Sequence, residues 1–193
     1  MEYEVIQILD LVEVIGENAA QDILSGFSCP LNQEIEHFLK NRAIDFARRK
    51  MSITHLVFNA DGRFVAFFTL AHKPIIVSAD GLSRTAQRKM EKYAKFDEAI
   101  HAFNASAFLI AQFGKNYAVQ DGAGISGDVL MDLVYDALTE IQHQIGGGIV
   151  FLECEDREKL IQFYESETNR FRRFGERYSE GDGVKYIQLL RFL

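Results

Sequence analysis

The stretch from Ala105 to His143 constrains the fold more than any other part of this sequence. Ser106–Gly114 (SAFLIAQFG) is an apolar run typical of a buried strand, and Val119–Gly127 (VQDGAGISG) is too rich in glycine for a helix or a strand. From Gly127 onward, apolar side chains recur at helical spacing. The stretch therefore predicts a buried strand, a glycine loop and a long amphipathic helix, in that order.

This order of elements suits a phosphate group. The first turn of a helix has backbone N–H groups without intrahelical partners, and it carries the positive end of the helix dipole. No Gly-Lys-Ser/Thr follows the loop, and Gly122-x-Gly124-x-x-Gly127 does not open a doubly wound unit, so neither a P-loop nor a dinucleotide fingerprint is present. Two interpretations stay open: a phosphate-binding loop, or glycines that only let the helix pack closely on the sheet.

Length and composition indicate a compact protein with a real core. The chain has 193 residues, 48% of them hydrophobic, which predicts a single domain over 1–193. A net charge of −7 argues against broad nonspecific binding of nucleic acid but leaves room for local basic patches. Cys29 and Cys154 are the only cysteines, and the acidic N-terminus resembles neither a secretory signal nor a membrane span. We expect a cytoplasmic protein with no membrane partner.

The first fifty residues predict mainly helices. Tyr3–Ile15 fits a strand and a helix about equally well, because its apolar residues come in pairs. Asn18 is expected to cap a short helix that Gly26 ends. Asn32 is expected to open a longer helix that ends near the basic run Arg48–Lys50.

A hairpin is expected next. Ser52–Asn59 and Arg63–Ala71 are rich in β-branched and aromatic residues, and Ala60-Asp61-Gly62 between them contains a turn signal. Lys73-Pro74 is expected to end the second strand, with Ile75–Val77 as an extension beyond a bend.

The remaining elements complete an α/β pattern. Ser83 is expected to cap a short basic segment, Ile149–Cys154 to form a buried strand, Asp156–Glu165 a helix and Tyr186–Leu193 a last strand. With the central strand and helix, this order predicts one α/β domain built on a mixed sheet.

Several short motifs follow one another along most of the chain. They are Phe27-Ser28-Cys29, Leu31-Asn32, Phe38-Leu39, Phe67-Phe68-Thr69-Leu70, Ile125-Ser126-Gly127, Leu130-Met131, and Phe163-Tyr164-Glu165 before Phe171. In order and spacing they resemble the GCN5-related N-acetyltransferase (GNAT) family, and within it the small bacterial and phage-type members that include tRNA-acetylating toxins. The resemblance implies a mostly antiparallel central sheet flanked by helices.

The resemblance also implies acetyl-coenzyme A as cosubstrate. The family holds it on a strand edge and on the amides of the following loop, with the pyrophosphate at the helix N-terminus. The matching positions here are Ile110, Ala111 and Gln112 on the strand, and Gly124, Ser126, Gly127 and Asp128 in the loop. The family's usual loop signature would need a basic or amide residue at Gly122 and a glycine at Ile125, and this sequence has neither.

Tyr164 is the expected catalytic acid. Acetyl transfer from a thioester needs an acid for the departing thiolate, and a phenol, with a pKa near ~10, can return a proton to a thiol that titrates near ~8.5. The family uses the tyrosine of its Phe-Tyr pair in this way, which matches Tyr164. Without the resemblance, Tyr164 would be interpreted as an ordinary aromatic residue on the inner face of a helix.

The other chemistry-bearing residues are weaker candidates. Glu153 and Glu155 could accept a proton through water, although solvated or paired carboxylates are more common at such positions. Asn116 could orient the cofactor or the substrate, while Cys154 is expected in the core. The five histidines lack ligand spacing, so no metal site is predicted.

Two basic segments could suit RNA or the 3′-phosphate of coenzyme A. Arg170, Arg172, Arg173 and Arg177 alternate with aromatic residues, and a second cluster spans Arg84–Lys92. Because glutamates dilute the arginines, an exposed turn of mixed charge is the default interpretation of the first segment.

The leading hypothesis is an N-acetyltransferase that moves acetyl from acetyl-coenzyme A to an amine, with the acceptor against the early helices. The acceptor amine could belong to a small molecule, a protein or an aminoacyl-tRNA. The resemblance leaves a homodimer and an antitoxin partner open. The altered loop at Gly122 and Ile125 motivates the alternative, a non-catalytic binding protein or toxin–antitoxin component with the same fold.

Overall fold

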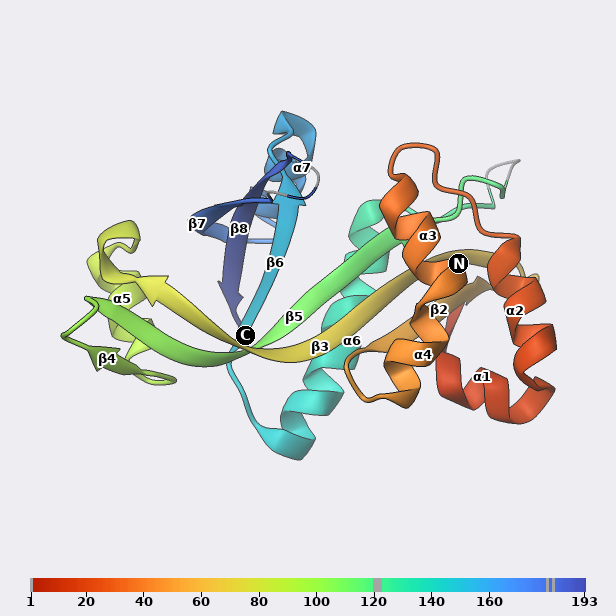
Figure 1. The fold of residues 1–193 in the computed structure, drawn as a ribbon, viewed down its shortest axis with the longest axis horizontal. Coiled ribbons are helices and arrows are strands. Elements are labelled where there is room, and N and C mark those ends of the chain that lie inside the picture. Colours follow the sequence, from red (N-terminus) through yellow and green to blue (C-terminus); the bar gives the residue numbers. More distant parts are fainter. Residues whose placement is uncertain (1, 120–122, 180, 182) are drawn as a thin grey trace. The chain divides into compact units, whose positions relative to one another are not determined.

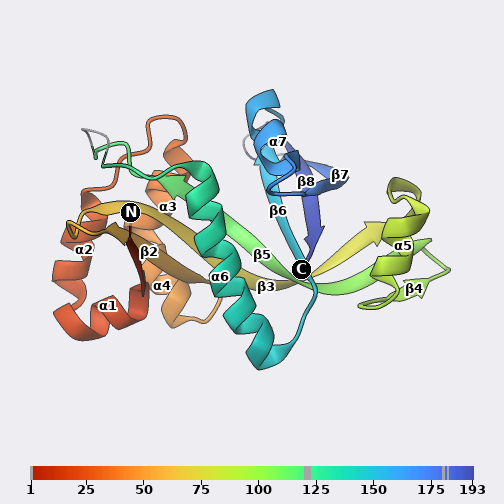
Figure 2. The same cartoon turned by 180° about the vertical axis from the view of Figure 1, so that it is seen from behind.

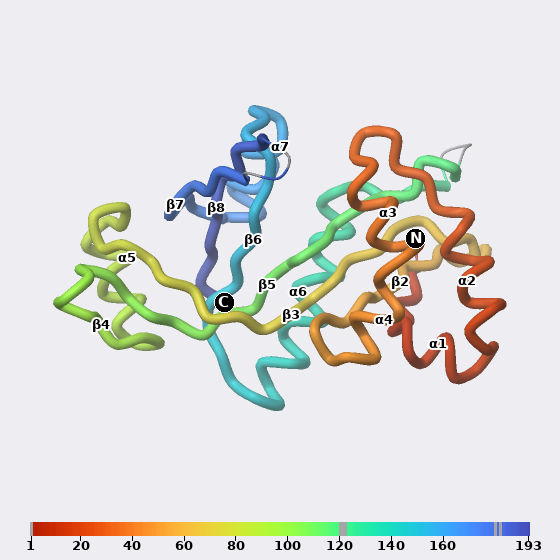
Figure 3. The backbone as a smooth tube through the Cα atoms, viewed as in Figure 1, coloured from red at the N-terminus to blue at the C-terminus, as the bar shows by residue number. Residues whose placement is uncertain are grey.

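A computed structural model describes residues 2–119, 123–179, 181 and 183–193 of the chain. The chain forms two compact units: unit 1 is Met1–Ala71 with Ile110–Asp136, and unit 2 is His72–Leu109 with Ala137–Leu193. Three elements contribute residues to both units, namely β3 (Phe64–Ser78), β5 (Ala102–Lys115) and α6 (Gly127–Ile145). Figure 3 traces the chain through them. The expectation of a single domain over 1–193 stays a prediction.

Unit 1 contains the expected hairpin. β1 (Tyr3–Gln7) pairs antiparallel with β2 (Ile53–Asn59), which pairs antiparallel with the first part of β3. At the turn, the Asn59 side-chain oxygen accepts hydrogen bonds from the backbone N–H groups of Asp61 and Arg63, and Gly62 has a φ of +73°. The turn needs a residue that tolerates positive φ, and glycine does so without steric cost. The hairpin prediction is confirmed.

The helices of unit 1 differ in detail from the prediction. They are α1 (Ile8–Ile15), α2 (Glu17–Ser25), α3 (Gln33–Asn41) and α4 (Ala43–Arg48). Tyr3–Ile15 is both a strand and a helix, since β1 runs directly into α1. α2 begins after Gly16, whose φ is +82°, so the cap predicted at Asn18 is wrong. Asn32 caps α3 as predicted, but α3 and α4 are separate helices because the backbone leaves helical geometry at Arg42.

The core of unit 1 lies between its sheet and its N-terminal helices. Figure 1 shows α3 and α4 over one face of β2 and β3, and Figure 2 shows the start of α6 over the other. The core includes fully buried side chains from the N-terminal helices, the chain after α2 and the sheet: Ile8, Leu24, Phe27, Leu39, Leu56 and Phe67. Burying aromatic and branched side chains of this size provides most of the driving force for folding.

Unit 2 contains the remaining elements. They are η1 (Ala79–Gly81), α5 (Arg84–Met90), β4 (Lys95–Asp97), β6 (Ile149–Glu155), α7 (Glu158–Glu165), β7 (Arg172–Tyr178) and β8 (Lys185–Phe192). Ser83 caps α5 as predicted, since its Oγ accepts a hydrogen bond from the Ala86 N–H at 3.2 Å. A second cluster of buried apolar side chains, including Val77, Met90, Phe103 and Ile149, forms the core of this unit.

Two sequence predictions about unit 2 are wrong. β3 does not end at Lys73-Pro74, because buried Ile75 and Val77 alternate with exposed Ile76 and continue the strand pattern. The arginine-rich segment is not an exposed turn. Arg172–Tyr178 forms β7, which pairs antiparallel with β8.

The strands pair in the order β1-β2-β3-β5-β6-β8-β7, and β4 pairs with β5. β5 and β6 are parallel, including the pairs Phe108–Val150 and Leu109–Phe151. The β1–β2, β2–β3, β4–β5, β6–β8 and β7–β8 pairs are antiparallel. The predicted α/β fold with a mixed, mostly antiparallel sheet is confirmed.

Candidate functional site

In unit 1, the predicted strand, loop and helix lead to a capped helix N-terminus. Ser126 caps α6: its carbonyl oxygen accepts from the Leu130 N–H at 3.1 Å, and its Oγ accepts from the Val129 N–H at 3.2 Å. Ile125 is buried and anchors the loop, whereas Gly124 and Ser126 are exposed. Gly122 lies outside the described residues. The loop therefore leaves the first turn of a 19-residue helix at the surface, where such turns can bind anions.

Asp128 lies in that first turn, and its side chain is exposed. A carboxylate at a helix N-terminus stabilises the helix through its dipole. The same charge would repel a phosphate, so a bound phosphate is compatible with Asp128 only through the backbone N–H.

The strand side of the candidate site is the end of β5. Ile110 is buried, while Ala111 and Gln112 are half-buried. At Gly114 a Cβ atom would lie 2.9 Å from Ile35 Cγ2 and 3.3 Å from Phe67 Cε1, which is closer than packed side chains allow. The glycine thus lets β5 approach the core of unit 1.

Asn116 follows β5 and holds three segments together. Its Nδ2 donates to the Phe64 carbonyl at 2.9 Å, and its Oδ1 accepts from the backbone N–H groups of Ser28 and Ala118 at 3.0 Å each. The side-chain nitrogen and oxygen of Asn116 both form hydrogen bonds to backbone groups. Asn116 is therefore a structural anchor of the loop between α2 and α3. Its suggested role in orienting cofactor or substrate stays a prediction.

A hollow of about 460 Å³ adjoins this anchor within unit 1. Its lining comes from the end of α2, the start of β3 and the chain after β5: Ile23, Gly26, Arg63, Phe64, Asn116, Ala118 and Val119. The sequence reasoning missed Arg63 and Ile23 as site residues. No local motif joins them, because their positions meet only in the folded chain.

In unit 2, Tyr164 lies in the last turn of α7, and its exposed fraction is 7%. Its ring meets the edge of the Phe171 ring at a centroid distance of 5.8 Å, and the Phe171 N–H donates to the Tyr164 carbonyl at 3.0 Å. Asn169 Nδ2 donates to the Phe163 carbonyl at 2.9 Å. These contacts fix the ring of Tyr164, as a positioned acid requires.

The two carboxylates considered as bases both form ion pairs. Glu153 accepts from Arg177 Nη2 at 2.8 Å and from Gln188 Nε2 at 2.8 Å. Burial alone would raise the pKa of Glu153, but these hydrogen bonds outweigh it and hold the pKa below its usual range. Glu155 pairs with Arg157 at 2.6 Å. With its pKa lowered in this way, Glu153 is a poor proton acceptor at neutral pH.

Cys154 is a core thiol, as expected. Burial raises its pKa to about 11, and nearby carboxylates, Asp156 first, act in the same direction. Such a thiol stays protonated and unreactive at neutral pH. Among the described residues there is no group of three or more His, Cys, Asp or Glu side chains that could hold a metal ion.

Tyr164 belongs to unit 2, and the seven residues expected to bind the cofactor belong to unit 1. The roles of these eight residues stay predictions.

The comparison with known proteins establishes the fold. No family model and no curated protein matches the sequence. The structure of AtaT complexed with acetyl-methionyl-tRNAfMet matches with a TM-score of 0.63 and 14% identity, over 96% of this chain and 94% of AtaT. A tyrosine-to-phenylalanine variant of KacT matches with the same TM-score, 17% identity and the same coverage.

A third match is AtaTR bound with AcCoA, with a TM-score of 0.59 and 14% identity over 99% of this chain and 93% of that one. At these identities the likeness concerns the path of the backbone. The chain therefore has the GNAT fold that AtaT and KacT share.

Proposed function

We propose that this protein is an acetyl-coenzyme A-dependent N-acetyltransferase toxin whose acceptor is the amino group of an aminoacyl-tRNA. The observation that carries the proposal is the match over nearly the whole chain to AtaT, solved with acetyl-methionyl-tRNAfMet. A matching structure of AtaTR is bound with AcCoA. Similarity along nearly the full length favours this function over one that uses only part of the fold.

The cofactor contacts belong to unit 1. Gly124, Ser126, Gly127 and Asp128 bind the pyrophosphate, and the backbone of Ile110, Ala111 and Gln112 binds the pantetheine arm. Two features support this assignment: Ser126 orients the first turn of α6, and a Cβ at Gly124 would meet no atom of the described residues within 4 Å, which leaves room for a ligand beside the loop. Acetyl-coenzyme A supplies the activated acetyl group as a thioester. The chain supplies backbone N–H donors for its negative charges.

Tyr164 acts as the acid. As the amine nitrogen forms its bond to the acetyl carbon, the carbon–sulfur bond breaks, and the phenol O–H donates its proton to the departing sulfur. The rigid aromatic contacts with Phe171 support this role. Because Glu153 and Glu155 are paired, the proton lost by the amine passes to water, and water returns a proton to the Tyr164 phenolate.

The acceptor end of the aminoacyl group fits the hollow in unit 1. Its apolar side, with Ile23 and Phe64, can receive an amino-acid side chain, and Arg63 can meet a phosphate or carbonyl oxygen. This placement agrees with the sequence-based expectation that the acceptor lies against the early helices.

An antitoxin partner and a cytoplasmic location complete the proposal. One matching structure holds an AtaT variant with the C-terminus of the antitoxin AtaR and acetyl-CoA, and another is a KacTA–DNA complex. No helix among the described residues is both long and apolar enough to cross a membrane. Co-purification of the chain with the product of the adjacent reading frame tests the partner.

The decisive test is transfer of radiolabelled acetyl from acetyl-coenzyme A to a panel of aminoacyl-tRNAs. We expect label on tRNA that alkaline hydrolysis releases as an N-acetyl amino acid. Small amines and peptides serve as competing acceptors. If only they carried label, the acceptor would be a small amine or a peptide and not an aminoacyl-tRNA. No transfer to any acceptor, and no rise in unfolding temperature with acetyl-coenzyme A, would favour a non-catalytic binding protein.

A further inference from the structure

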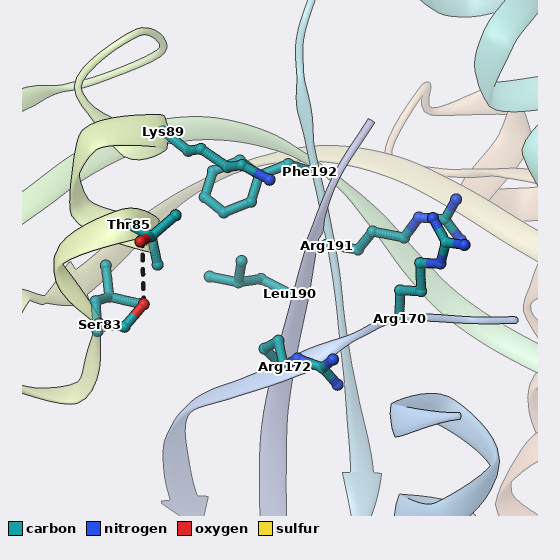
Figure 4. Close-up of a pocket in the computed structure, with 10 residues that line it drawn as sticks. Ser83, Thr85, Lys89, Arg170, Arg172, Leu190, Arg191 and Phe192 are labelled. Carbon is teal, nitrogen blue, oxygen red and sulfur yellow. Dashed lines mark hydrogen bonds between the residues drawn. The ribbon is translucent and has the colours of Figure 1, made fainter. Parts of the chain in front are cut away.

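Unit 2 contains a basic pocket that the acetyl-transfer chemistry does not use. It has a volume of about 380 Å³ and lies between α5, the chain before β7, and β8. We refer to it as the α5 pocket. Its lining residues are Leu82, Ser83, Thr85, Ala86, Lys89, Arg170, Arg172, Leu190, Arg191 and Phe192. Figure 4 shows side chains from these three segments around it.

Among the described residues, carboxylates do not neutralise Lys89, Arg170 and Arg172 of the α5 pocket. Arg170 Nε donates to the Glu167 carbonyl at 2.8 Å, and Arg172 Nη1 donates to the carbonyls of Glu165 and Phe171. Lys89 Nζ lies 5.7 Å from the centroid of the Phe192 ring. In the part of the chain that the structure describes, no carboxylate lies within ion-pair distance of these three side chains. Carbonyls and rings orient a cation without cancelling its charge.

Cations elsewhere on the same strands behave differently. Arg173 and Lys185 pair with Glu176, and Arg177 pairs with Glu153. In a chain with a net charge of −7, unpaired cations gathered in one cavity indicate an anionic ligand.

The spacing of the charges favours a chain of phosphates over a single one. Figure 4 shows Lys89 beside Phe192 on one side of the pocket, Arg170 and Arg191 on another, and Arg172 apart from both. Guanidinium groups bind phosphate oxygens through two N–H groups at once. The hydroxyls of Ser83 and Thr85 can bond to ribose 2′-OH groups.

The α5 pocket is also connected to Tyr164 within unit 2. Arg170 and Arg172 flank Phe171, whose ring contacts Tyr164 and whose N–H bonds to its carbonyl. We propose that the α5 pocket binds the phosphodiester backbone of the RNA acceptor. The choice of RNA as ligand rests on the proposed function. The new element is the location on the protein at which the backbone of that RNA binds.

The test measures RNA binding directly, without acetyl transfer. The probe is a fluorescently labelled single-stranded RNA of twelve nucleotides, titrated by anisotropy with the full chain at several salt concentrations. The pocket variant is Lys89→Gln with Arg172→Gln. The matched control, Arg88→Gln with Lys92→Gln, removes the same charge from exposed positions outside the pocket lining.

We expect the pocket variant to weaken RNA binding at least about tenfold and the control less than about twofold. Loss of two phosphate contacts should also make the slope of log K against log salt shallower by about 1.4. The conservative variant Lys89→Arg with Arg172→Lys keeps the charges and should bind within about threefold of the native chain. Equal losses in the pocket and control variants would overturn the proposal, because only net charge would then matter.

Two further arms distinguish other anions. If the pocket variant loses affinity for coenzyme A but not for dephospho-coenzyme A, the pocket holds the cofactor's 3′-phosphate and the proposal is wrong. If polyglutamate of equal charge competes as well as RNA, the pocket recognises acidic peptides and the proposal is again wrong. If RNA binding depends on the pocket but the chain transfers no acetyl group, the acetyltransferase proposal is wrong and the RNA-binding site is still supported.

Discussion

The two units carry the proposed functional groups in different forms. Unit 1 offers mainly backbone, namely the end of β5, the loop at Ser126 and the N-terminus of α6. Unit 2 offers side chains, with a buried tyrosine on α7 and cations around the α5 pocket. Backbone donors depend on the integrity of the fold, whereas a side-chain acid depends on one atom. Substitutions at the proposed cofactor-binding residues of unit 1 should therefore change stability and cofactor binding together, whereas removal of the Tyr164 hydroxyl in unit 2 should change chemistry alone.

Tyr164→Phe should give the largest effect and is the sharpest test of this difference. Removing one hydroxyl removes the acid but keeps the ring contact with Phe171, so kcat should fall about 100- to 1000-fold. This corresponds to about 3–4 kcal/mol of transition-state stabilisation. Steady-state kinetics with aminoacyl-tRNA measures it, and the KM for acetyl-coenzyme A should stay unchanged.

The matched control is Tyr178→Phe, at a tyrosine on β7 whose exposed fraction is 66%. It should retain native activity. A Tyr164→Phe variant with native kcat would show that unit 2 does not provide the acid.

Asn116→Ala should show the opposite behaviour in unit 1. It leaves the Phe64 carbonyl and the N–H groups of Ser28 and Ala118 without their partner, at a cost of about 2–3 kcal/mol in the free energy of unfolding. Chemical denaturation measures the loss, and the affinity for acetyl-coenzyme A should fall with it. Asn104→Ala, at an exposed position of β5, should change stability by less than about 0.5 kcal/mol.

His55 makes the stability of unit 1 depend on pH. Burial lowers the pKa of His55 from its usual 6.5 to about 4, its Nδ1 has no hydrogen-bond partner among the described residues, and its ring stacks on Phe68. Between these two pH values the unfolded chain binds the proton more strongly than the folded chain. Stability is therefore lost as the pH falls from 6.5 toward 4, by about 2 kcal/mol at pH 4.5.

His55→Phe keeps the stacking and removes the titrating group. The dependence of the unfolding free energy on pH should then flatten by about 2 kcal/mol between pH 6.5 and 4.5. Exposed His143 on α6 provides the control, since His143→Gln should leave the pH profile unchanged. An equal change in both variants would assign the pH dependence to general charge rather than to burial.

Ser126→Ala should have the smallest effect, and it compares the two units most directly. Loss of the bond to the Val129 N–H should cost about 1 kcal/mol of stability and weaken binding of acetyl-coenzyme A a few-fold. Ser83→Ala removes an equivalent cap from α5 in unit 2, where the bond to the Ala86 N–H is also 3.2 Å. Isothermal titration should show weaker cofactor binding in the first variant only; a similar loss in both would break the comparison.

Local signals predicted much of the fold. Asn32 at the start of α3, Gly62 in the hairpin and the helical spacing after Gly127 each act within a few residues, so the sequence displays them. The same holds for Ser83 at the start of α5.

The errors arise where distant residues decide the structure. β7 was interpreted as a turn because its arginines and glutamates resemble a solvated segment. In the fold, its Arg177 pairs with Glu153 on β6, and its Glu176 pairs with Lys185 on β8. The α5 pocket was missed for the same reason, since Lys89 and Arg191 are far apart in the sequence. No pattern in a short window contains such pairings.

The division of unit 1 into two stretches of chain, Met1–Ala71 and Ile110–Asp136, has a consequence for protein synthesis. A ribosome releases β3 well before β5, its neighbour in the sheet, so the edge of β3 emerges with Phe64 and Phe67 but without its partner. Unpaired strand edges of this kind aggregate readily. The nascent chain therefore exposes that edge of β3 until the later segment arrives.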